Sequence, residues 1–227
     1  MADHKRNQSY YLLEGCPSVR LIRCTKGAHP GEDVNKNRLE AFTDGVIAIL
    51  ITIMMLEMKV PRGNNWAALE PLVPVLLTYL LSFIYLGIYW NNHHHMLQAA
   101  STVTGGILWA NLHLLFWLSL IPEATAWVDE TVYASVPTAI YGIVLLMAGV
   151  AYRVLQALII RSQGRSSLLQ RAVGRDWKGR LSLLAYATAL PVAFLYPLVA
   201  VVIYALVALL WLVPDRRIER IFPRGRE

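Results

Sequence analysis

The chain has 227 residues, of which 56% are hydrophobic and 16% charged, and its formal net charge is +6. This composition is too apolar for an ordinary soluble domain. Membrane proteins gather Lys and Arg to set their orientation, so the positive charge does not indicate nucleic-acid binding. The first forty residues contain no apolar core of a signal peptide, and Cys16 and Cys24 lie among them without a ligand cluster. We therefore expect a cytoplasmic tail with free thiols.

Apolar stretches predict an all-α integral membrane protein with six transmembrane helices. The first four spans are expected near residues 39–58, 72–95, 105–121 and 135–160. The last apolar run, Leu181–Val213, would be about 50 Å long as one helix, far more than a single crossing requires. Pro191 and Pro197 interrupt it, and proline disfavours helix at the preceding residue. We therefore divide it into two spans with a turn at residues 194–197.

The basic residues predict that both ends lie in the cytoplasm. Short cytoplasmic loops carry an excess of Lys and Arg, and 19 of the 21 fall on one side of a six-span arrangement. The other side receives Lys59, Arg62 and an acidic loop with Glu123, Asp129 and Glu130. The predicted domains are an N-terminal tail at 1–36, a six-helix domain at 37–213 and a basic C-terminal tail at 214–227.

Three ionisable residues stand at the start of the first span: Arg38, Glu40 and Asp44. An Asp or Arg in the middle of a membrane helix costs about 2.5 to 3.5 kcal/mol on insertion scales. Arg38 and Glu40 can reach the interface by snorkelling, which is the simpler interpretation for Glu40. Asp44 lies deeper, so we expect it to face protein or water and to have a partner.

Further along the first span, Ile49, Ile53 and Leu56 fall on one stripe of the helix, with Thr52 on its flank. Composition alone favours packing or lipid contact over a pore lining for such a stripe. Asp44 lies roughly 140° around the helix from Ile49, because successive residues are about 100° apart. The acid should therefore point toward neighbouring helices.

Candidate partners for Asp44 lie at the end of the second span, from Trp90 to His95, and in the third span at Asn111 and His113. Three consecutive histidines suggest a metal site, because imidazole is a common ligand. Only one or two of them can reach a common ion, however, since the helix turns them apart. We expect hydrogen-bonding residues and no metal. The chain also contains no G-x-S-x-G, H-E-x-x-H, Walker-type or T-V-G-Y-G motif, so we expect no enzyme and no carbonyl filter.

The first span carries Arg38, Phe42, Thr43 and Asp44 in the pattern R-x-x-x-F-T-D. This pattern resembles the first-helix signature R-x-x-x-F-S-D of the transmembrane protein 175 family, potassium channels of endosomes, lysosomes and bacteria. Thr43 keeps the hydroxyl of the usual Ser. Further similarities are Trp90-x-x-His93 at the end of span two, Asn111 before Leu112 in span three, and Pro122 closing that span.

The resemblance implies a potassium channel of the plasma membrane. Relatives with one six-helix unit assemble as homotetramers with the first helix around the pore. Ile49 would then form the constriction, and Thr52, Ile53 and Leu56 would form further pore layers. Potassium would be the permeant ion, and no cofactor would be needed. The resemblance also implies a network that anchors the first helix, made by Arg38, Asp44, Trp90, His93 and Asn111.

Two other functions stay open on the residues alone. A proton- or cation-coupled secondary transporter would suit intramembrane charges, histidines and proline-broken helices. It would need a binding site at the membrane midplane, whereas Asp44 lies near one end of its span. A membrane enzyme that uses the histidines is the third alternative.

Overall fold

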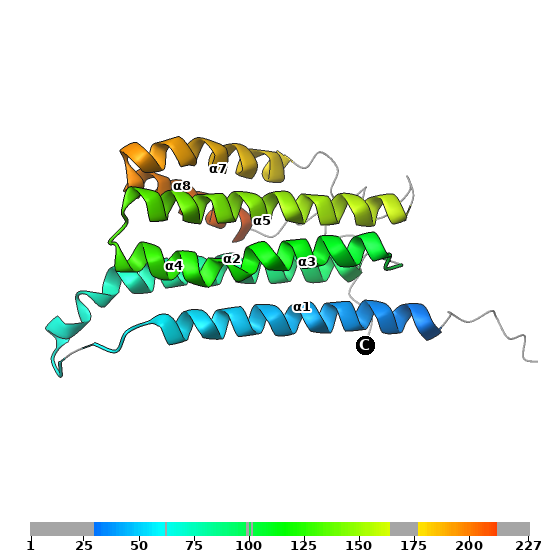
Figure 1. Ribbon diagram of the computed structural model, residues 1–227, viewed down its shortest axis with the longest axis horizontal. Helices are drawn as coiled ribbons and strands as arrows, with labels where there is room; N and C mark the ends of the chain where they lie inside the picture. Colours follow the sequence, from blue (N-terminus) through cyan, green and yellow to red (C-terminus); the bar gives the residue numbers. More distant parts are fainter. Residues whose placement is uncertain (1–29, 62, 99, 101, 164–176, 213–227) are drawn as a thin grey trace, which may run out of the picture. The chain divides into compact units, whose positions relative to one another are not determined.

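The computed structural model describes residues 30–61, 63–98, 100, 102–163 and 177–212. These residues are helical apart from short connections, and no strand occurs among them, which confirms the all-α prediction (Figure 1). The helices are α1 Pro30–Glu57, α2 Leu72–Gln98, α3 Gly105–Ser119, α4 Ile121–Glu130, α5 Ser135–Ser162, α7 Trp177–Leu195 and α8 Pro197–Leu212, with a 3-10 helix η1 at Trp66–Leu69. Residues 1–29 of the predicted N-terminal tail, the whole predicted C-terminal tail and both cysteines lie outside the described residues.

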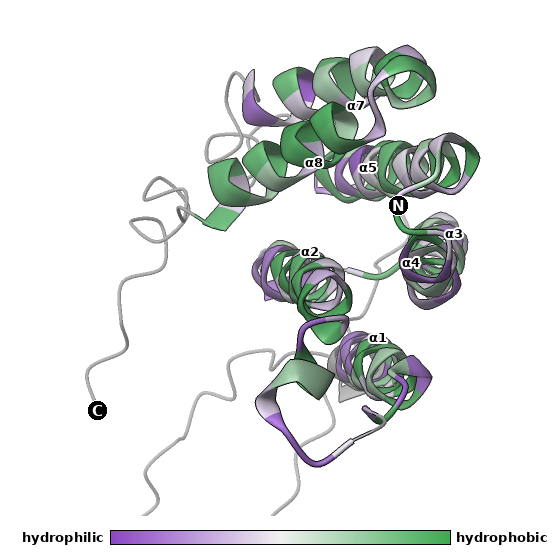
Figure 2. Cartoon of the chain, turned by 90° about the vertical axis from the view of Figure 1, so that its left-hand side faces the viewer, coloured by the Kyte–Doolittle hydropathy of each residue, from purple (hydrophilic) through white to green (hydrophobic). Residues whose placement is uncertain are grey.

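Four helical stretches of the described chain are long and apolar enough to cross a membrane: Lys36–Glu57, Leu72–Gln98, Gly105–Glu130 and Ser135–Ser162. They confirm the four spans that the sequence predicted most clearly. The helix α8 is strongly apolar but has 16 residues (Figure 2). The chain is therefore a multi-pass membrane protein.

The third span is longer than predicted. We expected it to close at Pro122, but Pro122 lies in the first turn of α4, and helix continues to Glu130. Proline is tolerated there because the first helical N–H groups have no intrahelical acceptor. Leu120 links the two helices: its carbonyl accepts a bond from the Ala124 N–H at 3.0 Å. The prediction of an acidic loop after the third span is wrong, because Glu123, Asp129 and Glu130 lie on α4.

The break between α7 and α8 falls where the two prolines predicted a turn. The α7 helix ends at Leu195 and α8 begins at Pro197, so Tyr196 alone separates them. The Tyr196 N–H still donates to the Val192 carbonyl at 2.7 Å. Pro191 lies inside α7 without ending it.

Small residues allow α5, α7 and α8 to pack closely. Ala148 and Ala151 of α5 and Ala189 of α7 have no exposed surface. Membrane helices associate through such small residues because lipid offers no hydrophobic drive for association. At Gly142 a Cβ atom would overlap the Tyr204 hydroxyl of α8, so any side chain there would force Tyr204 to move.

The helix α1 contributes one face to this bundle. Its buried residues repeat every three or four positions: Leu39, Thr43, Ile47, Leu50 and Met54. This spacing places them on one side of the helix. Much of the remaining α1 surface is exposed with respect to the described part of the chain.

Candidate functional site

A buried hydrogen-bonded bridge joins α1 to α3 and α2. The Asn111 amide nitrogen donates to the Thr43 hydroxyl at 2.9 Å, and the Asn111 carbonyl oxygen lies 2.7 Å from His93 Nε2. All three side chains are at most 1% exposed. Because the amide oxygen can only accept, His93 donates from Nε2 and is the Nε2–H tautomer when neutral. Its Nδ1 atom is buried and has no hydrogen-bond partner among the described residues.

A second set of contacts joins α1 to α2 alone. Trp90 Nε1 donates to Asp44 Oδ1 at 2.9 Å, and His94 Nδ1 is hydrogen-bonded to Glu40 Oε1. The rings of Trp90 and His94 are stacked, with centroids 6.2 Å apart. The two acids are one turn apart on α1 and meet two rings one turn apart on α2. His94 Nε2 lies 2.8 Å from Gln98 Nε2, so the contacts continue toward the end of α2. We call the contacts of Glu40 and Asp44 with α2 the acidic ladder.

Together these contacts fix how α1 is turned about its own axis. The buried bridge and the acidic ladder lie on adjacent flanks of α1, at Thr43 and Asp44. Rotation or sliding of α1 would separate both sets of partners at once, and unpaired polar groups are costly in a membrane. The face of α1 that points away from the bundle is therefore determined by polar contacts as well as by apolar packing.

The structure places the members of the R-x-x-x-F-T-D pattern in different surroundings. Thr43 and Asp44 contact neighbouring helices, as described. Arg38 is exposed and makes no hydrogen bond or ion pair with another described residue, and Phe42 is 52% exposed. Among the described residues, Arg38 therefore has no partner in the network that the resemblance implied, and its role there stays a prediction.

Sequence reasoning missed the contact between Glu40 and His94, because it placed Glu40 at the membrane interface. The signal was the spacing of Glu40 and Asp44, which repeats the spacing of Trp90 and His94. His113, a further candidate, accepts instead from Trp117 on its own helix at 2.9 Å.

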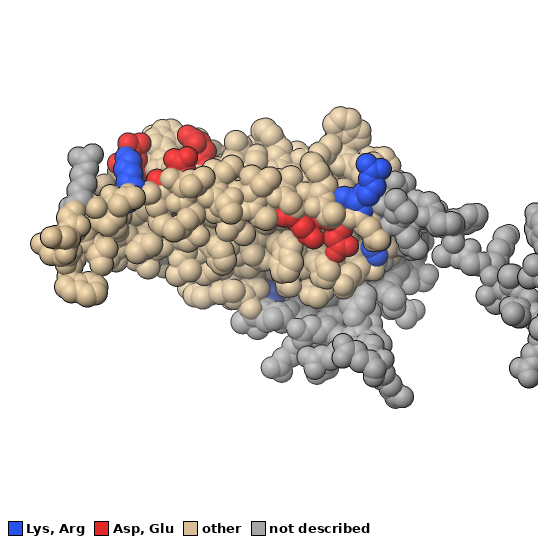
Figure 3. Space-filling model, turned by 90° about the horizontal axis from the view of Figure 1, so that it is seen from below, with Lys and Arg blue, Asp and Glu red and all other residues tan. Residues whose placement is uncertain are grey.

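The predicted pore stripe lies on the free face of α1. Ile49 is 58% exposed, Ile53 39% and Leu56 82%, and Thr52 is exposed beside them. The Thr52 hydroxyl donates to the Ile49 carbonyl at 2.8 Å, so its oxygen lone pairs face outward. Seen from the side of α1, charged groups gather toward the two ends, with uncharged surface between them (Figure 3).

The histidines at the end of α2 do not converge on a common point. His93 meets Asn111, and His94 meets Glu40 and Gln98. Within the described ranges, no group of three or more His, Cys, Asp or Glu side chains could hold a metal ion.

These features define a helical, multi-pass membrane protein whose first span is tied to the next two by polar side chains. The sequence profile described as endosomal/lysosomal potassium channel TMEM175 matches residues 38–122. A protein of Chryseobacterium sp. (strain P1-3) named as a potassium channel is 53% identical over 187 residues, which cover 82% of this chain and 97% of that protein. The chain belongs to the transmembrane protein 175 family.

Two further comparisons agree with this assignment. A protein of Streptomyces collinus named as a potassium channel is 34% identical over 126 residues, covering 52% of this chain and 61% of that protein. The crystal structure of a lysosomal potassium-selective channel TMEM175 homolog from Chamaesiphon minutus superimposes with a TM-score of 0.66 and 24% identity, covering 80% of this chain and 98% of that one. The latter similarity shows a shared fold.

Proposed function

We propose that the protein is a potassium channel of the plasma membrane, a homotetramer with both termini in the cytoplasm and four copies of α1 around the pore. The observation that carries the proposal is the orientation of α1. Its polar and buried side chains face the bundle, while Ile49, Thr52, Ile53 and Leu56 face away from it. The names of the relatives support potassium as the permeant ion.

Rings of Ile49, Ile53 and Leu56 would close the pore by excluding water. Apolar constrictions gate by dewetting, so conduction requires the rings to move apart. Potassium sheds its hydration shell at a lower cost than sodium does. A ring of Thr52 oxygens would replace part of that shell, because each hydroxyl proton is already directed at the Ile49 carbonyl.

The polar contacts of α1 would hold the pore helix in register with the bundle. Asp44→Ala removes the acceptor of the Trp90 N–H and leaves that donor unpaired at the helix contact. We expect loss of tetramer or of potassium flux, measured by size-exclusion chromatography and liposome flux. Normal flux from a stable Asp44→Ala tetramer would refute this anchoring role.

The channel is tested by potassium and sodium flux into liposomes that contain the purified protein. We expect potassium-selective flux that rises in Ile49→Asn, because a polar ring keeps the constriction wet. Leu206→Asn is the control, since Leu206 of α8 is 59% exposed, as Ile49 is 58%, but belongs to another helix. The proposal fails if wild type passes no ion under any gradient, or if both variants change flux equally.

The role of Thr52 has its own matched control. Thr188 of α7 is exposed and donates to the carbonyl three residues earlier, at Ala185, as Thr52 does to Ile49. Thr52→Val should lower the potassium-to-sodium permeability ratio, whereas Thr188→Val should not. An unchanged ratio in Thr52→Val would remove the threonine ring from the mechanism.

A further inference from the structure

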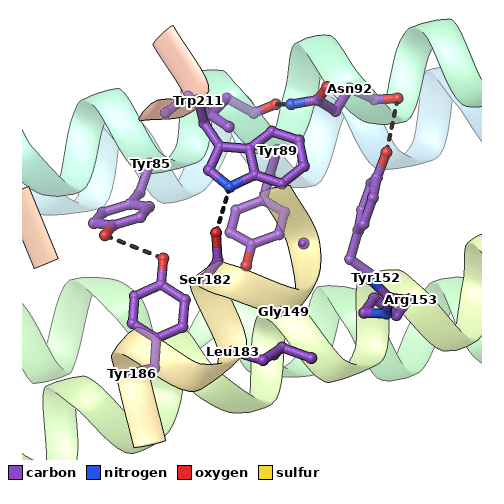
Figure 4. Close-up of a pocket in the computed structure, with 12 residues that line it drawn as sticks. Tyr85, Tyr89, Asn92, Gly149, Tyr152, Arg153, Ser182, Leu183, Tyr186 and Trp211 are labelled. Carbon is purple, nitrogen blue, oxygen red and sulfur yellow. Dashed lines mark hydrogen bonds between the residues drawn. The ribbon is translucent and has the colours of Figure 1, made fainter. Parts of the chain in front are cut away.

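A second feature lies away from α1, in a cleft between α2, α5, α7 and α8 (Figure 4). Most of its wall is aromatic or aliphatic, with tyrosines from three of the helices and Trp211 from α8. None of the residues discussed for the pore lines this cleft.

The cleft is long and narrow. It follows α2 from Tyr85 to Asn92, which is about 10 Å at 1.5 Å per residue. The cavity volume is about 50 Å³, counted as the space that the centre of a water-sized sphere can occupy. Gly149 of α5 keeps it open: a Cβ atom there would lie 3.1 Å from Leu183 Cδ2 and 3.8 Å from the Tyr89 hydroxyl. Such a slit fits a single extended chain better than a bulky molecule.

Several polar groups around the cleft are paired within the protein. Tyr186 donates to Tyr85, which in turn donates to the Tyr204 carbonyl. The Trp211 N–H donates to Ser182 at 2.8 Å. The Tyr89 side chain is only 9% exposed; its hydroxyl makes no hydrogen bond to another described residue and opens into the cleft beside Gly149.

A hydroxyl that opens into a mainly apolar cleft within a membrane span lacks the bulk water that would satisfy it, so the Tyr89 hydroxyl indicates a ligand that can accept a hydrogen bond. Ordered water needs two to four polar partners, and the wall around Tyr89 is mainly apolar. An occupant with one acceptor and a long apolar part suits the site better.

The polarity of the cleft changes along its length. Asn92, Tyr152 and Arg153 line one end, and Tyr85, Leu183 and Tyr186 line the other. The first end lies beside the polar stretch of α2 that begins at Asn91, where a span meets the lipid head groups. Tyr89 lies about one turn before Asn92, on the side of the middle of α2.

We propose that this cleft binds one acyl chain of a bilayer glycerophospholipid. The ester carbonyl accepts the Tyr89 hydroxyl hydrogen bond, the head group lies toward Arg153, and the chain passes Gly149 toward Leu183. This inference does not depend on the proposed channel activity.

The test uses full-length protein in vesicles that contain a phosphatidylglycerol with a diazirine midway along one chain. After illumination, the labelled peptides are identified by mass spectrometry. We expect labelling concentrated on the segments around Tyr89, Gly149 and Leu183 in wild type. Gly149→Leu, which fills the slit, should lose it. Gly87→Leu on α2 is the matched control, because a Cβ at Gly87 meets nothing within 4 Å, and it should keep the label.

Tyr89→Phe keeps the ring and removes only the hydroxyl, so it tests the proposal even if Gly149→Leu does not fold. Loss of one hydrogen bond of about 1 kcal/mol should weaken retention of the probe by about fivefold, measured by native mass spectrometry. Tyr79→Phe on the same helix should not change retention. Labelling spread evenly over the lipid-facing surface, equal labelling of Gly149→Leu and wild type, or labelling by a diazirine fatty acid but not by the phospholipid would each overturn the assignment.

Discussion

The buried bridge between Thr43 and Asn111 allows a quantitative test of how α1 is attached. Asn111→Leu keeps the approximate volume but removes both hydrogen bonds of the amide, leaving the His93 and Thr43 polar groups unpaired. Hydrogen bonds between membrane helices contribute about 0.6 kcal/mol on average and about 1.7 kcal/mol at most. Two such bonds predict a loss of about 1 to 3 kcal/mol in the free energy of unfolding.

A double-mutant cycle isolates one of these bonds. Thr43→Val removes the acceptor, so Thr43→Val and Asn111→Leu should show a coupling of about 0.5 to 1.7 kcal/mol. The measurement is reversible unfolding in mixed detergent and SDS micelles, followed by tryptophan fluorescence. The control cycle pairs Thr43→Val with Asn92→Leu. The Asn92 amide donates to the Ile88 carbonyl on its own helix, so this pair should show no coupling. Additive effects of Thr43→Val and Asn111→Leu would show that the bridge does not hold α1.

Two further predictions concern contacts elsewhere in the bundle. Gly142→Leu should prevent accumulation of folded protein, since even a Cβ would lie 2.0 Å from the Tyr204 hydroxyl, whereas Gly87→Leu should accumulate normally; equal yields on size-exclusion chromatography would contradict this. Lys59→Ala should leave thermal stability unchanged, because the 3.4 Å ion pair with Glu130 is exposed on both sides and well screened; a clear drop in Tm would contradict this.

The sequence predicted the spans well where a long apolar run made the assignment simple. It failed at Pro122, because proline permits helix at its own position and the sequence does not show whether a new helix begins there. The result was a third span that ended too early and acidic residues assigned to a loop.

Pairings between helices were harder to predict. Asp44 was expected to have a partner, and Trp90 was among the candidates, because a carboxylate in a span demands a donor. The matched four-residue spacing on the two helices is compatible with the contact of Glu40 with His94, but spacing alone does not specify which face of α1 meets α2. The cleft beside Tyr89 depends on four helices meeting, so sequence spacing gave no sign of it.

The free face of α1 separates two kinds of constraint on this chain. Substitutions at Thr43 or Asp44 act on the folding of the bundle, since these side chains hold helices together. Ile49 and Thr52 are exposed, so substitutions there leave the polar contacts of α1 with the other described helices in place. The exposed surface of α1 can therefore change in evolution while the contacts of Thr43 and Asp44 stay the same. Libraries of substitutions at Ile49 and Thr52 can be screened in a bundle that keeps these contacts.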